Sequence, residues 1–152
     1  MTFLLVLLLT LFDQLSKLLV VKYLLSRDLV LVPGFFKLMY LENSGAAFGI
    51  LQNKFLLFVA ITLVVVVAII YNLPRLKKFS LPYWSLVLIL AGTIGNFIDR
   101  VRLGYVVDFI SLKFKSYHFA VFNLADSMIV VGAIFLCFTI LKSDDKEASW
   151  KK

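Results

Sequence analysis

Residues 3–12 read FLLVLLLTLF, and this almost unbroken run of large apolar side chains decides the fold class. Apolar sequence resumes after Lys17, and the run has neither the cationic leader nor the small-residue cleavage site of a signal peptide. We therefore expect a retained transmembrane span over about 3–25. It must be helical, because lipid offers the backbone no hydrogen-bond partners and a helix of about 20 residues crosses the hydrocarbon core.

Composition extends this reading to the whole chain of 152 residues. Hydrophobic residues make up 62% and charged residues only 16%, whereas soluble domains are nearer half and a quarter. Three further apolar runs predict spans at about 55–73, 81–99 and 121–141. We expect an all-α membrane protein, a single domain over 1–152 with four transmembrane helices.

Two connections between the predicted spans are informative about the topology. Residues 26–54 contain Pro33-Gly34 and the small-residue stretch SGAAFG at 44–49, which together predict strands and turns at the membrane interface. The connection at 74–80 is short and basic, which indicates the cytoplasmic side. An even number of spans places both termini on that side as well.

The formal charge of +7 does not indicate nucleic-acid binding. The basic residues lie in short connections and at the C-terminus, where they meet anionic lipid headgroups. The single histidine, His118, excludes a histidine-ligated zinc peptidase, and the single cysteine, Cys137, excludes an internal disulfide.

Polar residues within the first span form one pair. Asp13 and Lys17 are spaced i, i+4, which places them on the same helix face. Ionisable residues inside a membrane are costly, so they mark function or neutralise one another. Both readings stay open for this pair: a structural salt bridge, or a polar face toward a cavity.

The third and fourth spans carry matching polar groups at the same depth. Asn96, Asp99 and Arg100 share one helix face near the end of the third span, and Asn123 and Asp126 are spaced i, i+3 early in the fourth. Together with the first span they predict a polar cavity near one membrane face. Arg100 has two structural alternatives, anchoring in the headgroups or pairing with Asp99.

Two carboxylates offer the best chemistry for such a cavity, Asp108 in GYVVDF and Asp126 in FNLADS. Close carboxylates do not both ionise, so one activates water while the protonated one donates to the scissile carbonyl. This division of labour defines an aspartic peptidase. Serine chemistry is weaker, because Ser127 follows Asp126 directly and points about 100° away around the helix, leaving only an unconvincing pairing with Lys17.

Five motifs in order resemble the lipoprotein signal peptidase family, the type II signal peptidases of bacteria. They are DQLSK at 13–17, NSGAAFG at 43–49, GNFIDR at 95–100, VVDF at 106–109 and FNLADS at 122–127. The resemblance implies four transmembrane helices, an extracytoplasmic β-rich cradle formed from the first long loop, and cytoplasmic termini in the bacterial inner membrane.

The same resemblance implies an activity and its residues. The family removes signal peptides from prolipoproteins just before a diacylglyceryl-modified cysteine, uses two aspartates without metal or cofactor, and is inhibited by cyclic peptide antibiotics of the globomycin type. The catalytic aspartates match Asp108 and Asp126. Residues that bind substrate or support the dyad match Asp13, Lys17, Asn43, Gly45, Asn96, Asp99, Arg100 and Asn123. Asn43 and Gly45 alternatively form an ordinary turn.

Two other classes of protein remain as rivals. A small proton-coupled transporter subunit also carries intramembrane charges, but it predicts polar residues through the full bilayer depth, and the second span has no charged residue. A structural four-helix scaffold explains the leucines and valines but not the polar residues at one level. An enzyme with a water-accessible cleft, acting on prolipoproteins among membrane lipids, explains both.

Overall fold

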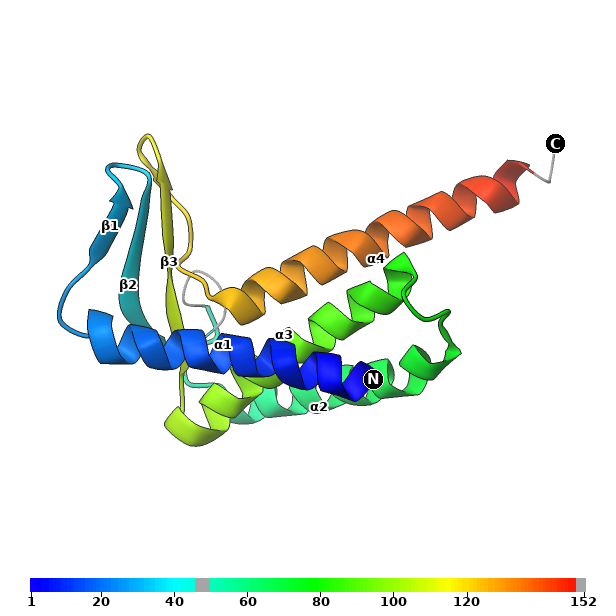
Figure 1. Ribbon diagram of the computed structural model, residues 1–152, viewed down its shortest axis with the longest axis horizontal. Coiled ribbons are helices and arrows are strands. Elements are labelled where there is room, and N and C mark those ends of the chain that lie inside the picture. Colours follow the sequence, from blue (N-terminus) through cyan, green and yellow to red (C-terminus); the bar gives the residue numbers. More distant parts are fainter. Residues whose placement is uncertain (46–49, 150–152) are drawn as a thin grey trace.

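The computed structural model describes residues 1–45 and 50–149. Its long helices are α1 (Thr2–Leu24), α2 (Phe55–Asn72), α3 (Leu81–Leu103) and α4 (Leu124–Ser149), with a short 3-10 turn, η2 (Leu73–Arg75), after α2. Four helical segments are long and apolar enough to cross a membrane: α1, α2 with η2, α3, and α4 as far as Lys142. A β-sheet lies at one end of the helices, and the start of α1 and the end of α4 lie away from it (Figure 1).

The sheet has four antiparallel strands in the order β1 (Leu29–Val32), β2 (Phe36–Asn43), β3 (Val106–Phe114) and β4 (Tyr117–His118). The strands predicted within 26–54 are present as β1 and β2. The connection between α3 and α4 adds β3 and β4 to the sheet. β3 pairs locally with β4 and, over a long sequence separation, with β2, and a local sequence pattern does not report the second pairing.

Two helix ends differ from the sequence prediction. Helix α3 continues four residues beyond 99 and ends at Leu103; the next residue, Gly104, adopts φ +84° and donates its N–H to the Arg100 carbonyl at 3.0 Å. Helix α4 begins at Leu124, so Asn123 lies just outside it. The prediction that Asn123 and Asp126 share a helix face inside the span is therefore wrong, since Asn123 caps the helix instead.

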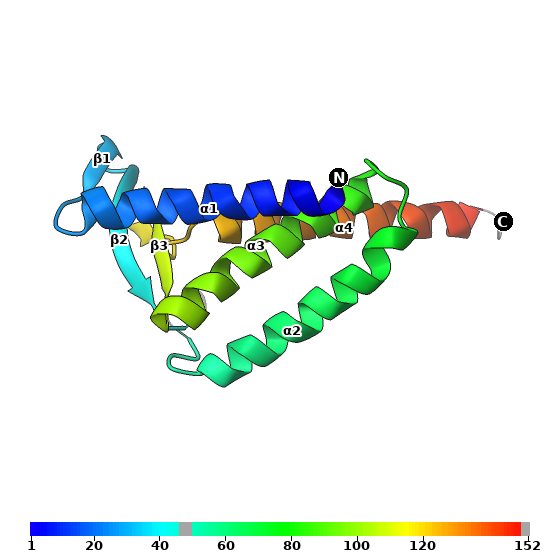
Figure 2. The ribbon, with the colours of Figure 1, turned by 60° about the horizontal axis from the view of Figure 1, so that its bottom comes forward.

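Helix α3 is central, with α1, α2 and α4 packed against it; Figure 2 shows α2 and α1 on opposite sides of it. Glycines let α3 and α4 approach closely: a methyl group on Gly92 would collide with the Ala125 carbonyl, and one on Gly132 would lie 2.7 Å from the Ser85 carbonyl oxygen. Small residues at a helix contact are typical of membrane bundles, where dispersion drives association.

Burial is inverted relative to a soluble domain. Large apolar side chains such as Phe3 and Leu56 are exposed on the helix surfaces, whereas Asp13, Asp108 and Asn123 are at most 1% exposed. Lipid solvates the outward side chains, so the polar groups are the ones that must be enclosed and paired. The polar interior lies at the sheet end of the bundle.

Candidate active site

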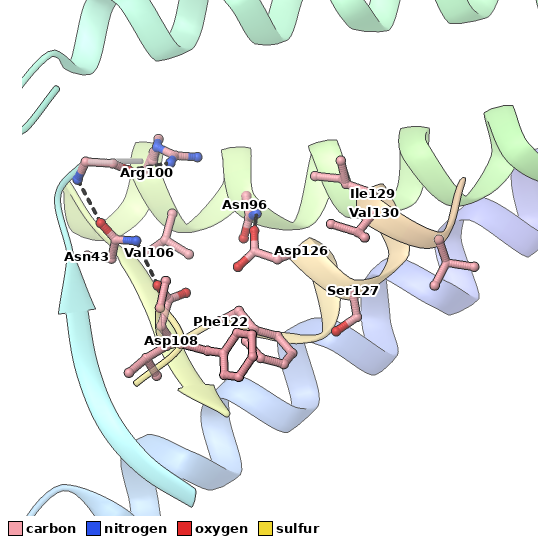
Figure 3. A pocket seen from close by; sticks show the side chains of 15 residues that line it. Asn43, Asn96, Arg100, Val106, Asp108, Phe122, Asp126, Ser127, Ile129 and Val130 are labelled. Carbon is pink, nitrogen blue, oxygen red and sulfur yellow. Dashed lines mark hydrogen bonds between the residues drawn. The ribbon is translucent and has the colours of Figure 1, made fainter. Parts of the chain in front are cut away.

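A cleft of about 600 Å³ opens where β2, β3 and the sheet-side ends of α3 and α4 meet. Figure 3 shows its polar end, to which β2, α3, β3 and α4 contribute side chains, and α4 continuing the wall beyond it. The polar lining residues are Asn43, Asn96, Arg100, Asp108, Asp126 and Ser127. The structure therefore brings Asp108 and Asp126, 18 positions apart in sequence, into one cleft.

Asp108 projects from β3 and accepts two amide hydrogen bonds. Asn123 Nδ2 donates to Oδ1 at 2.6 Å, and Asn43 Nδ2 donates to Oδ2 at 2.8 Å. Burial raises the pKa of Asp108, the negative charge of Asp126 raises it further, and the two amide donors oppose the rise only in part, which leaves it at about 7. Asp108 is thus the carboxyl group of the cleft that holds a proton near neutral pH.

Asp126 lies in the first turn of α4 and is held by a reciprocal cap. Asn123 Oδ1 accepts from the Asp126 N–H at 2.9 Å, and Asp126 Oδ2 accepts from the Asn123 N–H at 3.2 Å. Asn96 Nδ2 donates to Asp126 Oδ1 at 2.7 Å. The partial positive charge of a helix N-terminus also stabilises a carboxylate at this position.

The Asn96 amide can face in only one direction. Its oxygen accepts from Lys17 Nζ at 3.0 Å and from Asn123 Nδ2 at 3.2 Å. Two donors at the oxygen leave the NH2 group pointing toward Asp126. Asn96 and Asn123 therefore tie both aspartates to one fixed network.

Behind the cleft lies a second group of polar residues, here called the buried ion cluster, with three ionisable members, Asp13, Lys17 and Asp99, and the neutral Gln14. Lys17 Nζ lies 2.9 Å from both Asp13 Oδ2 and Asp99 Oδ2, with all three side chains at most 4% exposed. Asp13 Oδ1 also accepts from the Ala125 N–H, and Asp99 Oδ2 from the Val107 N–H. The cluster fastens α1 to α3, β3 and the start of α4.

Gln14 is a member that sequence reasoning missed. Its Nε2 donates to Asp99 Oδ1 at 2.9 Å and to the Gly95 carbonyl at 3.1 Å. The position next to Asp13 in DQLSK was its only signal, because an uncharged glutamine in an apolar span carries no i, i+4 partner.

Arg100, Asn43 and Gly45 line one side of the cleft. Arg100 donates to the Gly45 carbonyl at 3.2 Å and lies 4.4 Å over the Phe58 ring, so it links this loop to α2. Asp99 pairs with Lys17, and the alternative pairing with Arg100 is wrong. Asn43 Oδ1 accepts from the Gly45 N–H, which shapes the turn. The rest of that motif, 46–49, lies outside the described residues.

The geometry does not support the serine and transporter alternatives. Ser127 Oγ donates to the carbonyl of Asn123, the residue that caps its helix, and Lys17 Nζ contacts Asp13, Asp99 and Asn96, so these two form no nucleophile–base pair. Within the described residues, the buried charged side chains all gather at the sheet end rather than along a transmembrane path. The pair of carboxyl groups in the cleft, Asp108 and Asp126, is what remains.

The family model described as signal peptidase (SPase) II matches residues 5–142. The chain belongs to the signal peptidase II family. A lipoprotein signal peptidase of Caldanaerobacter subterraneus subsp. tengcongensis is 53% identical over 130 residues, 85% of this chain and 88% of that protein. One from Streptococcus agalactiae is 49% identical over 137 residues, 87% of this chain and 86% of that protein.

The fold of this signal peptidase II family member matches that of solved relatives. A bacterial membrane enzyme determined by the in meso method superposes with a TM-score of 0.85 at 32% identity, covering 95% of this chain and 90% of that one. A second such enzyme gives a TM-score of 0.80 at 33% identity, with 93% and 92% covered. The predicted family, fold class and peptidase activity are confirmed, and the chain is a multi-pass membrane protein.

Proposed function

We propose that Asp108 and Asp126 are the catalytic pair of an aspartic endopeptidase that removes signal peptides from prolipoproteins, cleaving just before the diacylglyceryl-modified cysteine. The observation that carries the proposal is the meeting of these two carboxyl groups in one open cleft, joined through Asn123, which donates to both. Lys17 lies at the same membrane depth but forms its ion pairs with Asp13 and Asp99. Asp108 and Asp126 are therefore free to exchange protons with water and substrate.

The roles within the pair follow from their environments. Asp126, at a helix N-terminus and bound by Asn96 and Asn123, is the carboxylate that takes a proton from the attacking water as the water oxygen bonds to the scissile carbonyl carbon. Asp108 donates its proton to the carbonyl oxygen. Collapse of the tetrahedral intermediate returns the proton to Asp108, while Asp126 protonates the leaving nitrogen as the C–N bond breaks.

The remaining residues support this pair or the substrate. Asn96 and Asn123 orient the two carboxyl groups, and the ion cluster positions Asn96 and the start of α4 through Lys17 and Asp13. Arg100, Gly45 and Asn43 shape the loop that faces the substrate. The proposed supporting residues are Asp13, Lys17, Asn43, Gly45, Asn96, Asp99, Arg100 and Asn123.

We place the whole chain, as one peptidase domain, in the bacterial cytoplasmic membrane with the sheet and cleft on the extracytoplasmic side. The basic connection at 74–80 lies at the other end of the bundle, which supports a cytoplasmic position for it and for both termini. Labelling by an impermeant maleimide tests this, in a Cys137→Ser background with a single cysteine at Ser80 or at Ser116. In intact spheroplasts, Ser116→Cys is expected to react and Ser80→Cys is not; the reverse pattern overturns the orientation.

The activity is tested by cleavage of a diacylglyceryl-modified prolipoprotein by purified protein in lipid, with chelator present throughout. Wild type is expected to cleave, and folded Asp108→Asn and Asp126→Asn variants are not. Ser127→Ala is the matched control, because Ser127 lines the same cleft and its hydroxyl bonds only its own helix. Cleavage by both Asn variants, or loss of activity in Ser127→Ala alone, contradicts the proposal.

Inhibition by a globomycin-type cyclic peptide extends the same assay. A competitive pattern against the lipidated substrate is expected, since inhibitor and substrate would share the cleft. A non-competitive pattern would place the inhibitor elsewhere.

A further inference from the structure

The segment 119–122, between β4 and α4, forms one wall of the cleft. All four of its residues line it. Side chains alternate between the two sides of a regular extended chain, so a run of four consecutive lining residues indicates that main-chain as well as side-chain atoms border the cleft. This wall therefore presents main-chain atoms to the cleft, in addition to the side chains that form the other walls.

One edge of this segment is paired with β3 only at its ends. Phe119 N–H donates to the Leu112 carbonyl at 3.0 Å, and Phe122 N–H donates to the Ile110 carbonyl at 3.1 Å. Ala120 and Val121 both fall opposite the single residue between, which is the arrangement of a β-bulge. A bulge leaves main-chain groups out of the ladder.

Five consecutive main-chain polar groups are left over, from the Phe119 carbonyl to the Val121 carbonyl. Within residues 1–45 and 50–149 none of them forms a hydrogen bond to another part of the chain. Ala120 and Val121 are only partly exposed, and partly buried N–H and C=O groups require a partner. Water or a ligand in the cleft must supply it.

The unpaired groups lie next to the catalytic pair along the chain. The segment continues directly into Asn123, whose Nδ2 contacts Asp108 and whose N–H contacts Asp126. At about 3.3 Å per residue, Val121 is about 7 Å from Asn123. A chain paired with this edge would therefore meet the two carboxyl groups within two or three residues.

The cleft offers a second wall suited to an extended peptide. Ile129, Val130 and Val131 of α4 line it with apolar side chains. A strand has main-chain groups along its edges and side chains on its faces, so it satisfies a main-chain edge and an apolar wall at the same time.

We propose that residues 119–121 form a main-chain docking edge, along which the prolipoprotein binds as an added β-strand that carries its scissile bond to Asp108 and Asp126. The proposal rests on the proposed function and adds how the substrate backbone is held. Sequence tolerance follows from it, because main-chain hydrogen bonds are independent of side-chain identity.

The test replaces single substrate amides by esters, each of which removes one N–H donor, from three residues before the scissile bond to three after it. The scissile amide itself is left intact. With wild-type enzyme, kcat/KM is expected to fall about fivefold to tenfold at every second position on one side of the scissile bond. The reason is that every second residue of a strand faces a given partner strand. Changes within twofold at every position, or equal losses at successive positions, overturn the proposal.

A second test removes a main-chain N–H group from the enzyme instead of from the substrate. Ala120→Pro removes one N–H, whereas Ala120→Ser at the same position keeps it. The proline variant is expected to lose about tenfold more in kcat/KM than the serine variant at an equal melting temperature. Equal kinetics in the two folded variants would contradict a main-chain role. If the proline variant does not fold, the ester series with wild-type enzyme is the deciding test.

Failure here is separable from failure of the proposed function. Cleavage of the all-amide substrate by wild type, and its loss in the dyad variants, establishes the catalytic pair whatever the ester series shows. An absence of cleavage of the all-amide substrate would remove the peptidase proposal itself.

Discussion

The buried ion cluster and the cleft pair contain the same kind of group at the same level of the membrane, yet they suit opposite purposes. In the cluster, Asp13 and Asp99 share Lys17 at 2.9 Å and accept further donors from the chain. In the cleft, Asp108 and Asp126 receive neutral amide donors and face open space. An enclosed carboxylate in an ion pair is structural, whereas two carboxyl groups beside a cleft that accept only amide hydrogen bonds from side chains retain a proton to transfer.

The largest expected difference between the two regions is in catalysis. Asp126→Asn removes the proposed base and should lower kcat/KM by about 10³-fold or more, with little change in melting temperature. Asp99→Asn should do the reverse, weakening the ion cluster while the folded fraction retains turnover. Steady-state cleavage and thermal unfolding in the same detergent measure both, and equal activity losses in the two variants would erase the distinction.

The next effect tests the neutralising cation. Lys17→Met leaves Asp13 and Asp99 buried without their counter-ion and should reduce the free energy of unfolding by about 3–5 kcal/mol. Adding Asp13→Asn restores the original net charge of the cluster and should recover part of the loss. A single variant as stable as wild type would show that Lys17 is not needed for neutralisation.

Asn96 connects the two regions and should affect rate more than stability. Asn96→Asp keeps an oxygen for Lys17 but loses the NH2 donor to Asp126, so kcat should fall about 10- to 100-fold, the value of a hydrogen bond to a charged group. The melting temperature should fall less than in Lys17→Met, because Lys17 still pairs with the added carboxylate. Full activity in this variant would make Asn96 a purely structural contact.

The pH dependence sharpens the assignment of the proton. Because the pKa of Asp108 is about 7 in the folded protein, kcat/KM should fall about tenfold per pH unit above that value as the acid is lost. Its ordinary pKa of 3.8 is lower, so the folded state binds this proton more tightly and Asp108 makes stability fall between about pH 4 and 7. Asp108→Asn should remove that part of the slope, and an unchanged slope would contradict the shift.

The smallest effect belongs to Gln14. Replacing it by Met removes a neutral donor from Asp99 Oδ1 and should cost about 1–2 kcal/mol of stability, with kcat unchanged because Gln14 does not contact the cleft pair. Thermal unfolding together with kcat separates the two. A large loss of kcat at full stability would assign Gln14 to the catalytic region instead.

The sequence was sufficient for the membrane class, the approximate spans and most of the polar residues that meet at one depth. Hydrophobic runs report spans directly, because lipid imposes a minimum length and forbids unpaired backbone. Helical spacing likewise placed Asp13 with Lys17, which the structure pairs. These are properties of single segments, so local pattern carries them.

Only the tertiary structure decided which aspartate keeps which partner. The strand that carries Asp108, the contact between Asn123 and Asp108, and the contact between Gln14 and Asp99 depend on residues 15 to 85 positions apart. Such contacts are selected by packing α1 and β3 against α3 and α4, and no local signal encodes them. The sequence therefore determined that carboxyl groups gather at one membrane face, and the fold determined that Lys17 neutralises one set while the other opens into a cleft.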